Sequence, residues 1–376
     1  QVDPPTRTVS GVKVSGDRVS STTWQAGANA RMPLFNQNNS ATIRQAAASA
    51  GLSEADLEAA RQDLIVRLAQ AYFDVLAAQD TLAFVQAQKA AVSEQLASAK
   101  RNFEVGTTTV TDSREAQARY DLVVAQEIAA ENDLRVKRLA LDQLVGITGT
   151  KPQPLALPVQ LPTVQPDNVT TWVDTARDQQ PGVRQAAIAL DIARLETKKA
   201  ETGHLPTLDL QVGYNVTRNP NGTITAPGVN NRTNSASVGV AFNLPLFAGF
   251  AVQNRVKETL ALEEKASADL ETTRRNVAQA TRAAFFGVQS GQGQVQALEA
   301  AEASSQSALD ANKLGYQVGV RINIDVLNAQ SQLFQTKRDL AQARYNVLLG
   351  TLKLRQAAGT LTQQDIEAIN ALLIKP

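Results

Sequence analysis

The chain has 376 residues, and its 37 Lys and Arg against 36 Asp and Glu give a formal net charge of +1. This balance argues against a nucleic-acid partner, because binding phosphates requires an excess of Lys and Arg. With no Cys and a single His, disulfide frameworks, metal clusters and Ser-His-Asp catalysis are excluded, so we expect no enzyme, no cofactor and no metal site.

The first predicted elements are β-strands. From about residue 22 to residue 35, apolar and polar residues alternate with the two-residue period of a strand. The apolar face of this segment consists of Trp24, Ala26, Ala28, Ala30, Met32 and Leu34. A weaker strand is expected at about residues 8–17, where Val12 and Val14 alternate with polar residues.

Two long helices follow, at about residues 53–103 and 112–146. The first contains no proline, and at 1.5 Å per residue it would form a rod of roughly 75 Å. The sequence Ser53-x-x-Asp56 resembles a capping signal at its start. A strap at about residues 147–166 contains five prolines, which predicts an extended connector without chemistry of its own.

The segment 167–359 repeats this order, and residues 360–376 form a C-terminal segment. The segment 167–359 contains a helix at about 169–201, strands at about 207–217 and 236–247, and then long helices. Strands of about ten residues with one apolar and one polar face are typical of a transmembrane β-barrel with a polar lumen. Four strands cannot close a barrel, and lipid does not tolerate an open sheet edge. Several chains must therefore contribute strands to one barrel.

The last long helix has a seven-residue apolar repeat. Its main stripe consists of Val326, Leu333, Leu340, Val347 and Leu354, and an adjacent stripe of Leu327, Phe334, Ala341 and Leu348. Such spacing predicts a left-handed coiled-coil contact with neighbouring helices. The equivalent helix of the first half has Glu127 within its stripe, so its contact should be less regular.

These similarities reflect an internal duplication. Residues 103–107 and their downstream neighbours recur 213 positions later, so that Val105-Gly106 corresponds to Val318-Gly319. One unit, at about residues 24–146, is therefore present twice. The second copy is preceded by a helix and a strand that have no counterpart in the first. We therefore expect the natural protein to carry an N-terminal helix and most of one strand ahead of this chain.

The combined pattern resembles the TolC family of outer-membrane channel-tunnels. The resemblance rests on motifs and covers essentially the whole chain. The motifs are Gly203-His204-Leu205-Pro206-Thr207-Leu208, Phe103-x-Val105-Gly106 with Thr111-Asp112, Tyr316-x-Val318-Gly319-x-Arg321-x-x-x-Asp325-Val326-Leu327, and Gly359-Thr360-Leu361.

The resemblance implies an α+β membrane protein in which long antiparallel coiled-coil helices form an α-barrel in the periplasm. Its strands would form a transmembrane β-barrel shared between the protomers of a homotrimer in outer-membrane lipid. The implied function is an export duct for multidrug efflux or type I secretion. The implied partners are a periplasmic adaptor and an inner-membrane pump of the ABC, RND or MFS type.

The family closes its tunnel at the periplasmic tip with a few polar links. By the resemblance, the candidates here are Thr111 and Asp112 of the first turn and Tyr316 and Arg321 of the second. An arginine and a carboxylate pair well because their hydrogen-bonding geometries match. Asp112 could equally well cap the returning helix, and the two roles can coexist.

Asp325 matches a family position whose carboxylates ring the entrance. The second acidic position of that motif holds Asn328, which removes three formal charges per trimer. We therefore expect weaker cation selectivity, and weaker block by multivalent cations, than in a relative with two aspartates. The alternative for Asp325 is a solvated residue at a helix start.

Two Gly-containing turns match the family's adaptor-docking tips. They consist of Val105, Gly106 and Thr107, and of Val318, Gly319 and Val320. Glycine also simply permits a tight turn between antiparallel helices.

A different class of function stays open at this point, namely a soluble periplasmic coiled-coil scaffold or adaptor protein whose strands form a small sheet domain.

Overall fold

A computed structural model describes residues 7–9, 12–14, 21–156, 159, 161–223 and 226–374. The chain divides into two compact units. The first, called the sheet unit, comprises residues 1–50 and 189–267, and the second, called the helical unit, comprises residues 51–188 and 268–376. None of the described helices has an apolar stretch of the length that crossing a membrane requires.

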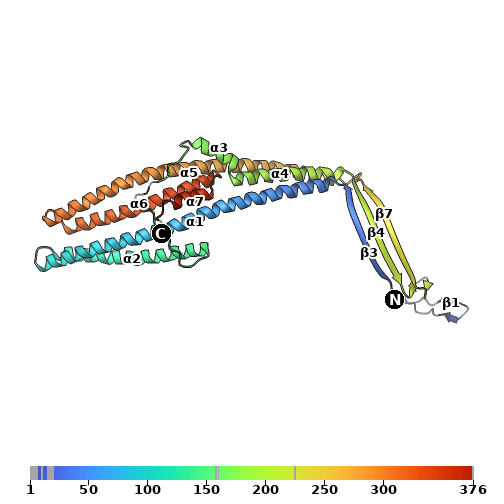
Figure 1. Ribbon diagram of the computed structural model, residues 1–376, viewed down its shortest axis with the longest axis horizontal. Coiled ribbons are helices and arrows are strands. Elements are labelled where there is room, and N and C mark those ends of the chain that lie inside the picture. Colours follow the sequence, from blue (N-terminus) through green and yellow to red (C-terminus); the bar gives the residue numbers. More distant parts are fainter. Residues whose placement is uncertain are drawn as a thin grey trace. The chain divides into compact units, whose positions relative to one another are not determined.

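Three long antiparallel strands form the sheet unit's main sheet (Figure 1). Strand β4 (Thr207–Asn219) lies between β3 (Trp24–Phe35) and β7 (Asn231–Asn243). In this sheet the predicted apolar faces fall in register, because Val212 lies opposite both Ala30 and Val238. The alternation read from the sequence is therefore confirmed as one apolar face shared by three strands.

The opposite face of this sheet is polar. Asn29 lies opposite Gly213, and Gly213 lies opposite Ser237. On the same face, the guanidinium of Arg31 contacts the buried carboxylate of Asp209 at 2.5 Å. A buried carboxylate is costly without a partner, so this ion pair compensates the only acidic residue of β4.

Two of the strand predictions need correction. The strand expected at 236–247 runs from Asn231 to Asn243, because Pro245 cannot donate a ladder hydrogen bond. The segment expected as a weak strand at 8–17 is described only in part. There, β1 (Arg7–Val9) and β2 (Val12–Val14) pair with each other and not with the main sheet. A second short hairpin, β5 (Gly222–Thr223) with β6 (Ala226–Pro227), lies between β4 and β7.

The helix expected from about residue 53 begins much earlier. Helix α1 runs from Gln37 to Glu104. The side chain of Asn36 accepts a hydrogen bond from the Asn39 main-chain N–H at 3.1 Å, which satisfies one of the free donors at the helix start. The Ser53-x-x-Asp56 signature therefore lies within the helix, and Gly51 does not interrupt it.

The helix expected at 169–201 is two helices. Helix α3 (Val169–Gln179) ends where Pro181 begins α4 (Pro181–Glu201). Proline lacks the N–H that a continuing helix needs, but it suits the first position of a new one. The side chain of Gln180 accepts a hydrogen bond from the Val183 N–H at 3.0 Å and so caps α4. A short 3₁₀ turn, η1 (Thr202–His204), then leads into β4.

In the sheet unit, α1, α4 and the start of α5 (Ala251–Gln317) share an ion-pair network. The Glu196 carboxylate accepts hydrogen bonds from Arg255 at 2.8 Å and from Gln45 at 3.0 Å. The Arg255 guanidinium, followed by the Gln45 amide, lowers the pKa of Glu196, because both partners stabilise the charged form.

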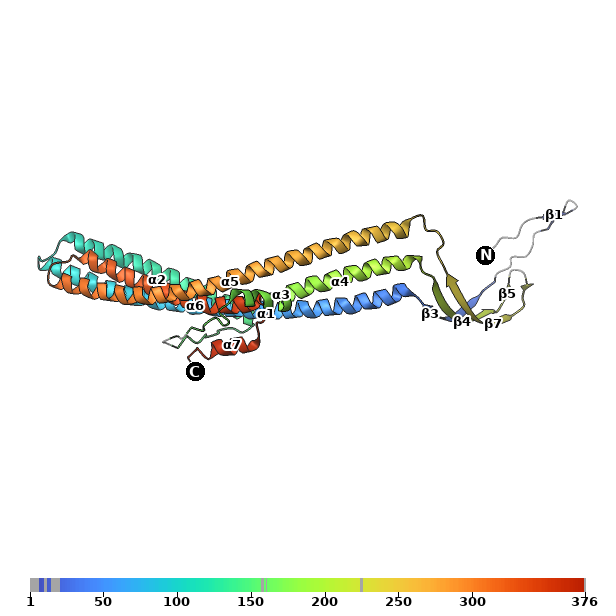
Figure 2. The same ribbon diagram turned by 90° about the horizontal axis from the view of Figure 1, so that it is seen from above.

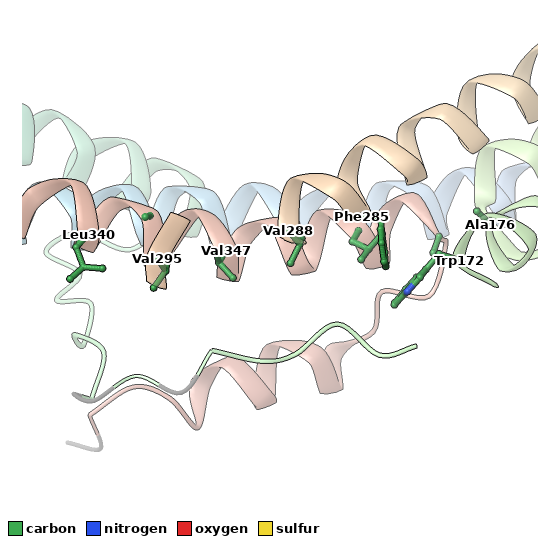
Figure 3. Packing of buried hydrophobic residues seen from close by; sticks show 10 residues of the cluster. Trp172, Ala176, Phe285, Val288, Val295, Leu340 and Val347 are labelled. Atoms are coloured by element: carbon green, nitrogen blue, oxygen red, sulfur yellow. The ribbon is translucent and has the colours of Figure 1, made fainter. Parts of the chain in front are cut away.

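In the helical unit, α6 (Asn323–Ala357) packs between α5 and α1. The predicted heptad stripe is buried against α5 and α3, as Figure 3 shows for Leu340 and Val347 beside Val288 and Val295. The adjacent stripe, including Leu327 and Leu348, packs against α1. The two stripes thus serve two different neighbours, and the predicted burial of the heptad stripe is confirmed.

Helix α2 (Val110–Val145) packs against α1 through a less regular contact. Val123 and Leu134 are buried against α1, and Glu127 between them pairs with Lys89 at 2.5 Å. The hydrogen bond to Glu127 raises the pKa of Lys89. A charged residue within an apolar stripe is therefore accommodated by a cation from the facing helix.

The strap and the C-terminal segment pack against each other and against α6. Leu155 forms an isolated antiparallel bridge with Leu373, just after α7 (Gln363–Asn370). Residues 157, 158 and 160 of the predicted strap lie outside the described residues. Nearby, the Tyr345 hydroxyl donates to Asp80 at 2.6 Å, and burial raises the pKa of both groups.

Candidate functional site

The α1–α2 and α5–α6 connections lie at the same end of the helical unit (Figure 2). They are called here the first tip turn, residues 105–109, and the second tip turn, residues 318–322. The Thr107 N–H donates to the Asn102 carbonyl at 2.8 Å, and the Val320 N–H donates to the Gly315 carbonyl at 2.9 Å. The duplication therefore preserves the hydrogen-bonding pattern of the turn.

Each tip turn depends on one glycine. Gly106 has a φ of 78° and Gly319 a φ of 80°, which is the left-handed region that other residues rarely adopt. A side chain at either position would meet no atom within 4 Å, so only the backbone conformation requires glycine. The tight-turn interpretation of these glycines is thus supported by the backbone geometry.

Asp112 belongs to a capping box at the start of α2. Its carboxylate accepts hydrogen bonds from the Thr109 N–H at 3.1 Å and from the Thr109 hydroxyl at 3.0 Å. The Thr109 hydroxyl oxygen in turn accepts from the Asp112 N–H at 3.3 Å. Thr111 beside it is exposed. Within the protomer, the carboxylate of Asp112 therefore serves the helix end.

Asp325 has a different partner in the second tip turn. The N-cap residue of α6 is Ile322, whose side chain makes no capping hydrogen bond. The Asp325 carboxylate instead lies 3.7 Å from the guanidinium of Arg321, one helical turn away. Arg321 and Asp112 form no ion pair with each other within this protomer, although both residues are described.

Side-chain hydrogen bonds join the two tips. The Asn102 amide donates to the Tyr316 hydroxyl at 3.3 Å, and Arg119 donates to the Asn328 side-chain oxygen at 2.9 Å. Asn323, at the start of α6, donates to the Asp112 carbonyl at 3.3 Å. Two of the predicted gate residues, Tyr316 and Asn328, are therefore contacts between the α1–α2 and α5–α6 hairpins.

Apolar side chains are exposed around both turns. The set contains the predicted docking residues Val105, Val318 and Val320, of which Val320 is 76% exposed. The exposed apolar residues at this end are Phe103, Val105, Val110, Leu314, Val318, Val320 and Ile322. An apolar patch at a helical tip is typical of a surface that another protein covers.

Sequence reasoning missed several residues of the site. Thr109 could have been found, because Thr109-x-x-Asp112 is a capping-box signature before a helix. Gln95, Arg119 and Asn323 carry no local signal, because their partners lie far away in sequence. Such contacts become visible only when the two hairpins are placed side by side.

A protein family described as "Outer membrane efflux protein" matches residues 6–147 and 172–360. The two matched stretches fall on the two halves of the duplication and omit the strap. Together they cover most of the chain.

Curated proteins and a solved structure are similar to the chain along most of its length. The outer membrane protein TolC of Vibrio cholerae is 36% identical over 92% of this chain and 79% of that protein. The alkaline protease secretion protein AprF of Pseudomonas aeruginosa is 30% identical over 91% of this chain and 70% of that protein. The crystal structure of CusC superposes with a TM-score of 0.76 at 20% identity, covering 92% of this chain and 80% of CusC.

Proposed function

We propose a trimeric export duct as the working form of this chain, which belongs to the outer membrane efflux protein family. The chain is an outer-membrane channel of the efflux and secretion type, and it is a transport protein, not an enzyme. This membership decides against the soluble scaffold that the sequence alone left open. The assembly, its partners and the roles of individual residues form the proposal.

The observation that carries the proposal is the sheet with one exposed apolar face. On it, Val238 is 76% and Val240 62% exposed. The described residues pair β3 and β7 on one side only, each with β4. In lipid, a free strand edge leaves main-chain groups without partners, so these edges require strands from other copies. Three copies, the number implied by the family resemblance, would close a β-barrel with the polar face toward its lumen.

The tip turns are proposed as the gate and the docking surface. Thr111, Asp112, Tyr316, Arg321, Asp325 and Asn328 would form the constriction in the closed form. The exposed valines of the two tip turns would contact the helical hairpin of a periplasmic adaptor, which connects the duct to an inner-membrane pump of the ABC, RND or MFS type. Support comes from the apolar exposure of the tips and from the polar contacts beside them.

The exported substrate is proposed to be set by the pump. The similar proteins include two named for protease secretion and others named for the outer membrane or for efflux. Cross-linking the chain to its inner-membrane partner in cells, followed by mass spectrometry, would identify the pump and so the substrate class.

The proposal is tested with Val212→Asp, which places a charge on the apolar face of the sheet. We expect loss of outer-membrane fractionation and of trimers in cross-linking, because a charge facing lipid is costly. Gln211→Asp, on the polar face of the same strand, is the matched control and should retain both. A wild-type chain that stays in aqueous solution as a monomer without detergent, and forms no channels in planar bilayers, would overturn the proposal.

A further inference from the structure

Asn323 is a polar side chain buried at the contact between three helices. It is 1% exposed and begins α6. Its side-chain oxygen accepts a hydrogen bond from Gln95 of α1, and its amide nitrogen donates to the Asp112 carbonyl of α2 at 3.3 Å. Both hydrogen-bonding ends of one amide thus connect the α5–α6 hairpin to the α1–α2 hairpin.

We propose that Asn323 is a positioning residue of the gate, which holds the two hairpin tips in the arrangement that narrows the entrance. The inference rests on the proposed role of the tips as a gate. Unlike the exposed ion pair between Arg321 and Asp325, which lies within one tip turn, the buried contacts of Asn323 join the two hairpins.

The internal duplication shows that the turn itself does not need an asparagine. Val110 occupies the equivalent position of the first copy and is 51% exposed. Three main-chain hydrogen bonds and the glycine conformation are nevertheless common to both tip turns, and the second turn adds a bond from the Arg321 N–H to the Gly315 carbonyl at 3.1 Å. The amide of Asn323 therefore serves the contact with α1 and α2 and not the local fold.

The surroundings of Asn323 make its two hydrogen bonds specific to one arrangement. Its neighbours along α6, Val326 and Leu327, are buried, and Leu96 beside Gln95 is buried on α1. A buried amide that loses its partners is destabilised, because little water can reach it. Sliding of one hairpin along the other would break both bonds together, so the amide opposes this displacement more than an apolar side chain would.

The test is Asn323→Leu, recorded as single channels in planar bilayers. We expect at least a roughly fivefold rise in the fraction of time in the larger conductance level, because two hydrogen bonds across the hairpins are lost. Asn346→Leu is the matched control, since Asn346 is exposed on the same helix and its side chain accepts from Gln342 of that helix. The control should behave as wild type.

A second pair of variants separates positioning from general loosening of the fold. Gln95→Leu removes the donor from α1 and should also favour the larger level. The exchange Gln95→Asn with Asn323→Gln keeps both amides and should restore wild-type behaviour in part. If Asn323→Leu fails to form trimers, Gln95→Leu decides the question alone. Wild-type gating in whichever of the two assembles would overturn the inference, whereas absence of channels in the wild type would overturn the proposed function itself.

Discussion

The two tip turns have the same backbone but use their carboxylates differently. In the first, the Thr109 hydroxyl and N–H both donate to Asp112, and the carboxylate caps α2. In the second, Ile322 stands in place of the threonine and offers no hydroxyl, and Asp325 contacts Arg321. A single change at the N-cap is therefore enough to release a carboxylate from a structural role without altering the turn.

The two turns also differ in whether an arginine is present to pair with the carboxylate. Arg321 corresponds to Thr108 in the first copy. The side chains of Arg321 and Asp325 are 59% and 33% exposed, so their ion pair contributes little to folding stability. Of the two turns, the second has a carboxylate and a guanidinium without a capping role, whereas the first has the capped helix start.

The largest effect on the proposed gate is expected from Arg321→Ser. In the closed form of the proposed gate, the Arg321 guanidinium of each copy would pair with a carboxylate outside its own turn; such an exposed pair contributes about 0.5 kcal/mol, and losing three of them would change the closed-to-open ratio by about tenfold. Single-channel conductance in planar bilayers should rise accordingly. Arg114→Ser, which removes an exposed arginine near the start of α2, is the control and should leave conductance unchanged. An equal rise of conductance in both variants would show that the two turns do not differ in function.

The next largest effect tests whether the two turns share the same backbone constraint. Gly106→Ala and Gly319→Ala each place a side chain at a φ near 80° and should each cost about 1–2 kcal/mol of folding stability. Neither position offers a contact that could offset this strain. The midpoint of heat unfolding in detergent should fall by similar amounts. A much larger fall for one glycine would show that its turn has a constraint that the other lacks.

The backbone and packing of the helical unit follow from the sequence more directly than the site does. The heptad stripe of α6 predicts its buried face because the seven-residue spacing repeats the same contact along the helix. Gly106 and Gly319 likewise mark both turns. The start of α1 could not be placed, because the Ala-rich residues 37–52 have no apolar stripe and Ser53-x-x-Asp56 resembles a cap.

The candidate site was predicted as residue positions, without its contacts. Matching motifs gave Asp112, Arg321 and Asp325 as candidates, yet the sequence does not say which carboxylate faces which partner. The capping role of Asp112 is one of the two alternatives predicted from the sequence, but its partner Thr109 was not named. The Arg119–Asn328 hydrogen bond could not, because it depends on how α2 and α6 lie against each other.

Exchanging the caps should change stability and gating in opposite directions at the two turns. Thr109→Ala should cost about 1 kcal/mol of stability at the start of α2 and lower conductance, because it releases the Asp112 carboxylate to pair within the proposed gate. Ile322→Thr should add a capping box to α6, gain about 0.5 kcal/mol and raise conductance, because Asp325 would then pair with the new hydroxyl instead of Arg321. Heat unfolding and bilayer recordings of the same preparations measure both quantities. A fall of conductance in Ile322→Thr would contradict the assigned role of Asp325.

The smallest effect is expected from Asn328→Asp, which supplies the second acidic residue that the family resemblance places at the proposed entrance. Three added carboxylates per trimer would by themselves attract multivalent cations. However, Arg119 already donates to residue 328 at 2.9 Å, and it would pair with an aspartate there and offset much of the new charge. The concentration of hexaamminecobalt(III) that halves the current should therefore fall only about twofold.

In the double variant Asn328→Asp with Arg119→Gln, this concentration should fall further, because the new carboxylate then has no compensating cation. A large fall in Asn328→Asp alone would show that Arg119 does not neutralise this position. The cation selectivity of the proposed entrance would then depend on the charges of α6 alone, and the contact between α6 and α2 would not affect it.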